Sequence, residues 1–536
     1  MQTKKSQSFL RGAAILTATT LIVKILSALY KIPLGRILSD ETFAHFNVSS
    51  NIYALALILA ASGLPMAISK LVAYADASGN RHEVTQIFHA ALKALVIMGI
   101  VIALAMVIFA NRFALLMNDP KASASITVLA PATFFVCVAA VYKGYAQGLR
   151  NMTPSSISQI IETVIKLGVG LALSVYLINA GKSSDIVSAG AAVGQSVGAA
   201  LGMIYLIATV KRPRYATLND TNILITERFD SSNTEHSKKE RNILISLFKL
   251  GIPISLGSSV TAIITLIGAA LTLHRLALYS SGMETGLYGA FAKLQTLSNI
   301  PASFFVPLTM SIMPAISSGL ATGDTKTLAS VNETTSKLLL LLALPCAIGI
   351  CILSDPLLRV VYPASYSTEA VMALRILGAA SFFACNALTG TAVLQARSYE
   401  IISVVIMSVG IAIMAIVTYM LTPFWGISGA ATGLSSCFIT ISVASSIVLR
   451  LRADHRLPKG FAKAVLANLF MGITALVLLY VSVNIAQNRA IIALVLPILG
   501  AVPVYAISVI SLGIVTADDL ASAPRGTKIA KLLRLK

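Results

Sequence analysis

Long apolar stretches separated by short polar segments run along the whole 536-residue chain. A membrane-spanning helix needs about 20 mainly apolar residues, because backbone groups in lipid are satisfied only within a helix or a closed barrel. Such stretches lie at 12–32, 47–72, 88–110, 124–147, 156–180, 186–210, 243–273, 286–316, 337–354, 370–395, 400–421, 427–449, 461–484 and 490–515. Their continuous apolarity excludes the alternating pattern of an outer-membrane barrel. The pattern predicts an all-α integral membrane protein with about 14 transmembrane helices.

Composition agrees with this class. Apolar residues make up 56% of the chain and charged residues only 12%, whereas a soluble domain must cover itself with polar groups. Lys4, Lys5 and Arg11 precede the first apolar stretch, as in a secretory signal. However, Lys24 interrupts that stretch and many further spans follow, so we expect a retained first helix.

Lys and Arg are distributed unevenly among the predicted loops. If the N-terminus is cytoplasmic, most loop Lys and Arg fall on the cytoplasmic side, and the other side holds only Arg36, Arg112, Lys121, Lys182, Arg359 and Arg489. The positive-inside rule therefore predicts that both termini are cytoplasmic. Attraction of these loops to anionic lipids accounts for most of the basic pI of 9.8, so we expect membrane lipids and no nucleic acid as partners.

Ionisable residues within or bordering the spans are almost all positive. They are Lys24, Lys31, Lys70, Lys93, Lys143, Lys166, Lys249, Arg275, Lys293 and Arg375, and Glu162 is the one acid well inside a span. An unpaired charge at the bilayer centre costs at least about 2.5–3.5 kcal/mol, so such residues usually face a cavity, a partner or a substrate. Lysines near span ends, such as Lys70, Lys93, Lys143 and Lys249, are explained by snorkelling to the interface.

We take Lys24, Lys31, Lys293 and Arg375 as candidate cavity cations that bind an anionic substrate. Glu162 and Lys166 are four residues apart on the fifth span, which places them on one helix face. This spacing predicts an intrahelical pair, and both a structural role and a role in ion coupling stay open for it.

Short internal matches indicate a repeat. Ala67-Ile68-Ser69 matches Ala315-Ile316-Ser317, and AGAAVGQ at 189–195 resembles SGAATGL at 428–434. Six spans separate the matched elements, so both copies have the same orientation and predict two six-helix lobes in parallel pseudo-repeat around a central cavity. The expected parts are an N-terminal lobe at 1–210, a polar cytoplasmic linker at 211–242, a C-terminal lobe at 243–450, two extra helices at 451–515 and a basic cytoplasmic tail at 516–536.

Proline and glycine mark expected bends in the spans. Ser62-Gly63-Leu64-Pro65 interrupts the second span and Gly251-Ile252-Pro253 the seventh, while the eighth contains three prolines. The faces GAAVG and GAATG are typical of close helix packing.

Catalytic and metal-binding signatures are missing from the sequence. The five cysteines lack paired metal spacing, the six histidines do not cluster along the chain, and there is no GxxxxGK[ST] loop for ATP. We therefore expect neither an enzyme nor a metal or organic cofactor. Coupling to Na⁺, to H⁺ or to the membrane potential stays open.

Four segments carry a family resemblance: VKILSALYKIPLGRIL (23–38), YKGYAQGLRNMTPSSISQIIE (142–162), FAKLQTLSNIPASFFVPLTMSIMPAISSGLATGD (291–324) and LLALPCAIGICILSDPLLRVVYP (341–363). They resemble the MurJ-type lipid II flippases, with the YtgP and stage V sporulation protein B branch, of the multidrug/oligosaccharidyl-lipid/polysaccharide (MOP) exporter superfamily. The resemblance implies a bacterial cytoplasmic-membrane protein that moves an undecaprenyl-pyrophosphate-linked peptidoglycan precursor outward by alternating access. It also implies cell-wall synthesis proteins as partners.

The family's basic residues map onto this sequence only in part. The basic residue of the first helix falls on Lys24 and that of the eighth helix on Lys293, whereas another basic position falls near Tyr30, with Lys31 adjacent. A flippase for another lipid-linked glycan stays open as a rival. A drug exporter for organic cations would need acidic cavity residues, and a non-transporting scaffold for cell-wall enzymes would have no reason to bury Lys24 and Lys293.

Overall fold

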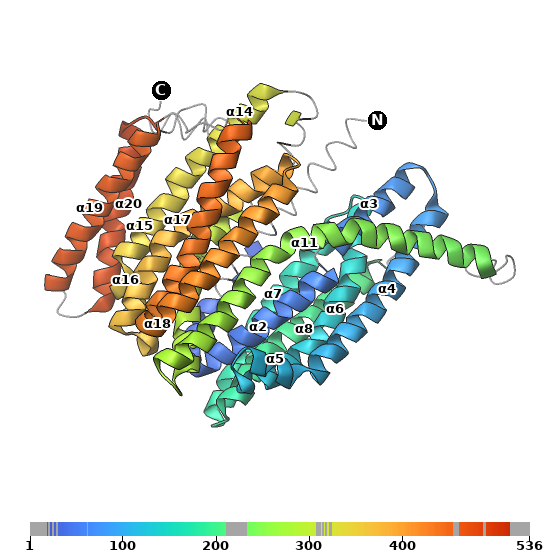
Figure 1. Ribbon diagram of the computed structural model, residues 1–536, viewed down its shortest axis with the longest axis horizontal. Helices are drawn as coiled ribbons and strands as arrows, with labels where there is room; N and C mark the ends of the chain where they lie inside the picture. Colours follow the sequence, from blue (N-terminus) through green and yellow to red (C-terminus); the bar gives the residue numbers. More distant parts are fainter. Residues whose placement is uncertain are drawn as a thin grey trace. The chain divides into compact units, whose positions relative to one another are not determined.

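The computed structural model describes residues 19, 22–23, 26–27, 30–61, 63–210, 233–306, 312, 316, 319–320, 324–453, 460–485 and 489–514. These residues form two compact units, one ending at Ala292 and one beginning at Lys293 (Figure 1). We call them unit 1 and unit 2. The division falls within α12 (Glu284–Ser298). Lys24, residues 211–232 of the predicted linker and the predicted tail lie outside the described residues.

Unit 1 is a helical bundle. Its helices are α2 (Asp40–Ala61), α3 (Leu64–Ala77), α4 (Arg81–Ile108), α5 (Ala110–Leu116), the short η1 (Pro120–Ala122), α6 (Ser123–Gly148), α7 (Thr153–Asn179), α8 (Ser184–Val210) and α11 (Asn233–Tyr279). A shared apolar core joins α3, α4 and α6 through residues such as Ile68, Leu95 and Val141. α7 and α8 pack along each other, and α8 also packs on α6.

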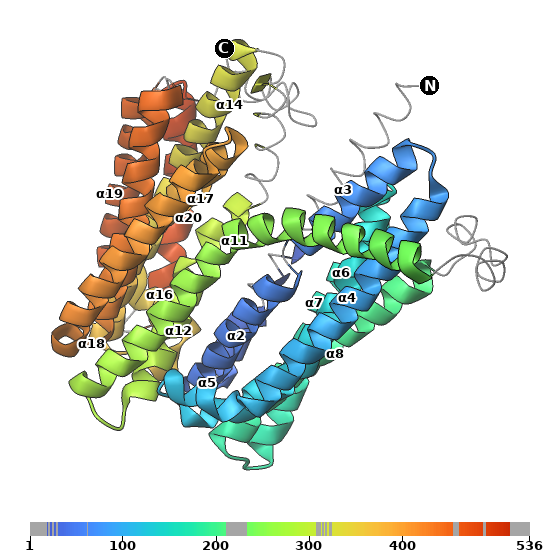
Figure 2. The same cartoon turned by 45° about the vertical axis from the view of Figure 1, so that its right-hand side comes forward.

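α11 packs against α2, α3 and α4 of unit 1 (Figure 2). The repeat in the sequence assigns this helix to the C-terminal lobe, so the compact units do not coincide with the expected lobe boundaries. The lobes are defined by sequence repetition and the units by contact. The lobe boundaries therefore stay a prediction.

Unit 2 is also helical. It contains α14 (Thr325–Leu338), the π-helical turn η2 (Leu339–Ala343), α15 (Leu344–Ile352), α16 (Ser354–Val361), the 3₁₀ turn η3 (Pro363–Ser365), α17 (Thr368–Ala396), α18 (Glu400–Ala453), α19 (Phe461–Ile485) and α20 (Ala490–Ser511). α17 packs on α18 and α15, and α19 packs on α20 and α15.

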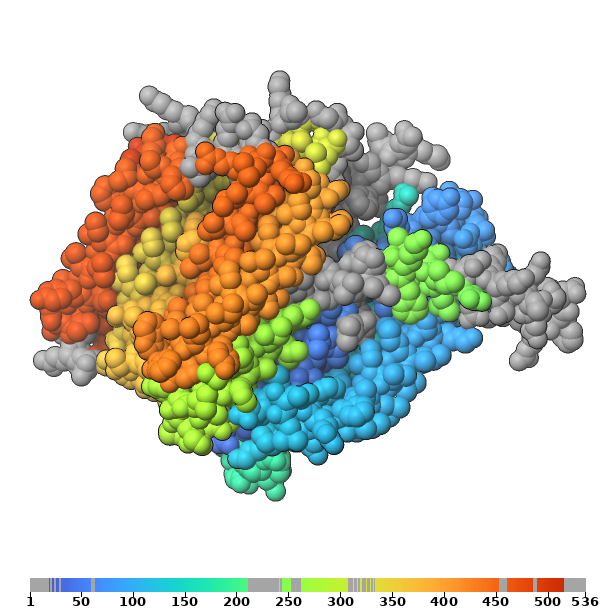
Figure 3. Space-filling model, in the orientation of Figure 1, coloured from blue at the N-terminus to red at the C-terminus, as the bar shows by residue number. Residues whose placement is uncertain are grey.

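Apolar side chains on the outer faces of these helices match a membrane environment. On α4, for example, Ile97, Val101, Leu104 and Ile108 are exposed. Figure 3 shows α4 at the surface of unit 1 and α18 at the surface of unit 2. Ten segments of the described residues are long and apolar enough to cross a membrane. The prediction of an all-α membrane protein is confirmed, while the count of fourteen helices stays a prediction.

The predicted bend in the second span is confirmed. The helix ends at Ala61 and restarts at Leu64, with Gly63 preceding the new helix and Pro65 in its first turn. Proline has no N–H to donate and its ring clashes with the preceding turn, so the first turn of a helix is the position that accommodates it without a kink. The predicted eleventh and twelfth spans form the two arms of α18, which is kinked at Gly426 with φ 51° and ψ −131°.

The small-residue faces GAAVG (190–194) and GAATG (429–433) occupy equivalent local positions. In α8, a Cβ on Gly194 or Gly198 would lie 2.5 Å from backbone atoms of α7. In the second arm of α18, a Cβ on Gly429 would lie 2.5 Å from the carbonyl oxygen of Leu421 in the first arm. Each motif therefore allows a helix to approach the helix before it, as the sequence predicts.

Candidate functional site

Basic residues of unit 1 gather around Tyr30. Its ring is buried, and the Nζ atom of Lys166 from α7 lies 5.3 Å from the ring centroid, a cation–π contact. Lys31 follows Tyr30 and is exposed, and it lies close enough to Lys166 for the two charges to interact. A cation from α7 thus stands beside the tyrosine at the position where the family resemblance implies a basic residue.

Glu162 contacts a different lysine from the one its helix spacing suggests. Its carboxylate lies 3.8 Å from Nζ of Lys143 on α6, and both side chains are partly buried. Lys166, one turn further along α7, points to Tyr30, although its charge still interacts with Glu162. The acid of the fifth span is therefore held between two lysines from different helices.

Lys293 is buried within unit 2, with 1% of its surface exposed. Its Nζ atom donates a hydrogen bond to Ser365 Oγ at 3.3 Å and lies 5.8 Å from the ring centroid of Tyr362. Tyr362 directly precedes the turn η3, which follows α16, and Ser365 is the last residue of that turn. The ammonium of Lys293 therefore lies beside the turn that follows α16.

The turn that contacts Lys293 is fixed from its exposed side. Tyr366 donates a hydrogen bond to Asp355 at 2.8 Å and accepts one from Arg359 at 2.7 Å. The bond to Asp355 raises the pKa of the Tyr366 phenol. Arg359 also lies 3.1 Å from the other oxygen of Asp355. These three side chains form a clamp outside η3, while Tyr362 and Ser365 face Lys293.

Tyr362 has a feature that packing alone does not explain. Its hydroxyl group is buried, and it has no hydrogen-bond partner within the described residues. Leaving a buried hydroxyl unsatisfied costs about 1–3 kcal/mol, so an unsatisfied group next to a buried cation suits a ligand.

Arg375, the other candidate in unit 2, is exposed on α17. Its charge acts on Cys351 of α15. Lys293 contacts Tyr362 and Ser365 instead, so these two candidates have different neighbours among the described residues. Within the same residues, no group of three or more His, Cys, Asp or Glu could hold a metal ion.

One ionisable cluster was missed by the sequence reasoning. His45 and Asp119 are both buried and in direct contact, although 74 positions separate them. Both fall in predicted loops, where a charged residue is ordinarily exposed to water and does not indicate a site. The only sequence signal is that each lies a few residues before an apolar stretch, which begins at 47 after His45 and at 124 after Asp119.

The model of the family described as "Polysaccharide biosynthesis protein" matches residues 9–320, which is more than half of the chain. The chain belongs to this family. Three Bacillus subtilis (strain 168) proteins are similar over most of their length: membrane protein YabM (28% identical, 98% of this chain and 96% of the relative), stage V sporulation protein B (24%, 82% of each) and lipid II flippase MurJ (22%, 84% of each).

Solved structures show the same fold. Lipid II flippase MurJ in an inward closed conformation aligns with a TM-score of 0.66 at 14% identity, covering 92% of this chain and 98% of that one. An inward-facing multidrug resistance MATE transporter of the MOP superfamily aligns with a TM-score of 0.64 at 13% identity, covering 82% and 98%. The fold that the family resemblance implies is thereby confirmed, and the family model and the curated relatives agree with that resemblance. The fold is shared by lipid flippases and drug exporters, so the substrate must be argued from side chains.

Proposed function

We propose that this member of the polysaccharide biosynthesis protein family is a flippase for an anionic, pyrophosphate-linked lipid glycan, and specifically for lipid II. The observation that carries this proposal is the sign of the charges held within the helices. The ammonium of Lys166 lies over one tyrosine ring in unit 1, and the ammonium of Lys293 lies over another in unit 2. The acid Glu162 lies beside two lysines, Lys143 and Lys166. Positive groups are the natural partners of a pyrophosphate that loses its hydration.

A drug exporter for organic cations fits these charges poorly. Such a site would use carboxylates to bind a positive substrate. Glu162, the acid within the fifth predicted span, instead lies beside Lys143. A carrier for another pyrophosphate-linked repeat unit uses the same chemistry. The family description supports this second candidate as well, because it names polysaccharide synthesis in general.

Translocation in proteoliposomes tests the proposal. Wild type should move lipid II to the opposite leaflet, and Lys24→Ala, Lys166→Met and Lys293→Met should each slow this movement at least about tenfold, a loss of about 1.4 kcal/mol. Lys182→Met is the matched control, because Lys182 is exposed in the α7–α8 loop. Full activity of Lys166→Met and Lys293→Met would refute the cation mechanism. Movement of another pyrophosphate-linked glycan, but not of lipid II, would favour the second candidate.

The proposed mechanism is alternating access driven at least partly by the membrane potential. Outward movement of an anionic headgroup from a negative interior gains about 2.3 kcal/mol per unit charge for each 100 mV. Vesicles with a potassium diffusion potential should therefore flip the substrate faster than vesicles clamped at zero. Equal rates under both conditions would remove the potential from the mechanism.

A further inference from the structure

A buried acid–base cluster lies where α2, η1 and α8 of unit 1 meet. His45 of α2 and Asp119, which precedes η1, are each 1% exposed. The ring atom Nδ1 of His45 lies 2.7 Å and 2.8 Å from the two carboxylate oxygens of Asp119. An ionisable pair this deeply buried in a membrane protein costs free energy to maintain, which indicates a function.

The other face of the imidazole also has polar partners. Nε2 lies 3.4 Å from Ser184 Oγ at the start of α8 and 3.6 Å from Oε1 of Glu41. The same oxygen of Glu41 accepts a hydrogen bond from Lys121 at 2.7 Å. Lys121 holds the pKa of Glu41 below its usual range, so this carboxylate stays ionised as an acceptor.

Both protonation states of His45 can be satisfied at this site. In the neutral ring, Nδ1–H donates to Asp119 and Nε2 accepts a hydrogen bond from the Ser184 hydroxyl. In the charged ring, Nε2 gains a hydrogen and needs an acceptor, which Glu41 supplies. Binding a proton therefore exchanges a serine contact on α8 for a carboxylate contact on α2.

The surrounding charges favour such an exchange. Asp185 of α8 also interacts electrostatically with His45, and Tyr288 of α12 interacts with Asp119. Around the ring, within the described residues, the carboxylates of Glu41, Asp119 and Asp185 interact with the ammonium of Lys121 or with His45 itself. A proton on His45 thus adds positive charge to a negatively charged neighbourhood. Histidine is the side chain whose charge ordinarily changes between about pH 5 and 8.

We propose that His45, held between Asp119 and Glu41, is a proton-binding site that couples protonation to the packing of α2 against η1 and α8. This site goes beyond the flippase assignment, because proton binding there does not depend on which substrate is carried. The chemical ligand is the proton itself. Its uptake would shift the hydrogen bonds of Glu41 between Lys121, Ser184 and His45.

The contacts from Ser184 to His45 and from His45 to Asp119 resemble the catalytic triad of serine hydrolases. However, the charges around Ser184 oppose a nucleophilic role. Ser184 Oγ donates to Glu41 at 3.4 Å, so a carboxylate stands beside the atom that would attack. Hydrolases instead place hydrogen-bond donors where the oxyanion develops. The negative charge of Glu41 suits a proton acceptor.

The first test measures proton binding directly in the purified full-length protein. Ring-labelled histidine gives NMR signals for the six histidines, and His45→Gln identifies the signal of His45. We expect this signal to change with pH in wild type and to respond differently to pH in Asp119→Asn. A His45 signal that is the same at every pH at which the protein stays folded overturns the proposal, whether or not the protein flips lipid.

The second test measures the coupling to helix packing. Spin labels at Arg36→Cys and Lys182→Cys, both exposed positions of unit 1 near the cluster, report the separation of the segments leading into α2 and α8. These labels require prior replacement of the native cysteines. Wild type should show different distance distributions at pH 6 and pH 8, and His45→Gln should show the same distribution at both. A pH response that persists in His45→Gln overturns the proposal.

Flipping provides the third readout. The exposed His89 of α4 supplies the matched control, because His89→Gln removes a titratable ring outside the cluster. Wild type and His89→Gln should change rate severalfold between pH 6 and pH 8, whereas His45→Gln should not. If wild type moves no lipid II at all, the flippase proposal fails while the NMR and spin-label results still decide the proton site.

Discussion

At the scale of single residues, the contact between Lys293 and Tyr362 separates stability from function. Tyr362→Phe keeps the ring under the ammonium and removes a buried, unsatisfied hydroxyl, so the variant should be at least as stable as wild type. Tyr362→Leu removes the aromatic face and should lose about 0.5–2 kcal/mol. Thermal unfolding in detergent measures both. If the hydroxyl binds substrate, Tyr362→Phe flips more slowly without unfolding earlier, and unchanged flipping would assign Tyr362 to packing alone.

The ion contact of Glu162 makes a second residue-scale prediction. The carboxylate of Glu162 lies 3.8 Å from the ammonium of Lys143 on the neighbouring helix. A double-mutant cycle of Glu162→Gln with Lys143→Met should therefore give a coupling energy of about 1 kcal/mol. The parallel cycle with Lys166→Met should give a smaller value, because the Lys166 ammonium lies over Tyr30. Unfolding free energies supply both cycles. A larger coupling to Lys166 would restore the intrahelical pair that the sequence favours.

At the scale of helices, the small-residue face of α8 makes the third prediction. A Cβ on Gly198 would lie 2.5 Å from the carbonyl oxygen of Glu162, so Gly198→Val must push α7 and α8 apart. Overpacking of this kind costs about 1–3 kcal/mol. Gly168→Ala on α7 is the control, because nothing lies within 4 Å of its added Cβ. Equal thermal stability of both variants would show that this helix pair is loosely packed.

Helix boundaries were predictable from sequence where local chemistry sets them. Pro65 fixes the break between α2 and α3, and the apolar run from 124 to 147 nearly coincides with α6. The partners of buried charges were not predictable in the same way. Glu162 has a lysine four residues ahead, yet its carboxylate faces Lys143 on another helix, since the packing of α6 against α7 decides which ammonium is near.

The site of His45 shows the same limit at longer range. Its partner Asp119 is 74 residues away, and Ser184 is a further 65 residues along the chain. The pattern of apolar residues describes each helix separately. It therefore identifies which charged residues are costly to bury, but not which residues of different helices are in contact. The sequence therefore supplied Lys293 as a buried cation, while Tyr362 and Ser365 had to come from the structure.

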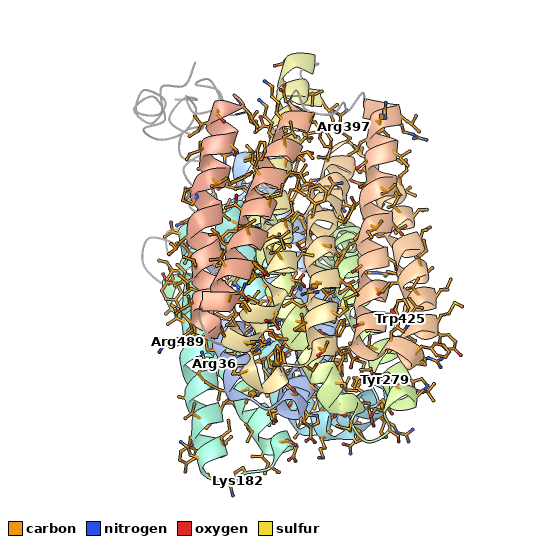
Figure 4. The ribbon with its side chains drawn as sticks, turned by 90° about the vertical axis from the view of Figure 1, so that its left-hand side faces the viewer. Arg36, Lys182, Tyr279, Arg397, Trp425 and Arg489 are labelled. Atoms are coloured by element: carbon orange, nitrogen blue, oxygen red, sulfur yellow. The ribbon has the colours of Figure 1, made fainter. Side chains whose placement is uncertain are left out.

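At the scale of the whole molecule, the distribution of charge predicts orientation. Within unit 2, Arg397 lies at the opposite end from Trp425 and Arg489, as the predicted loops require (Figure 4). The positive-inside rule places the end with Arg397 in the cytoplasm. Because Lys182 and Arg489 belong to the sparsely basic loops, they should face outward in cells.

Cysteine labelling tests this orientation. In a cysteine-free background, a membrane-impermeant maleimide added to intact cells should label Lys182→Cys and Arg489→Cys, whereas Arg397→Cys should react only after permeabilisation. The orientation also decides which compartment can protonate His45, because Ser184 of its cluster is two residues from Lys182. Labelling of Arg397→Cys in intact cells would reverse the topology. In the reversed topology, the His45 site would lie on the cytoplasmic side. The membrane potential would still favour outward movement of an anionic headgroup, but the headgroup would pass the helices in the opposite direction.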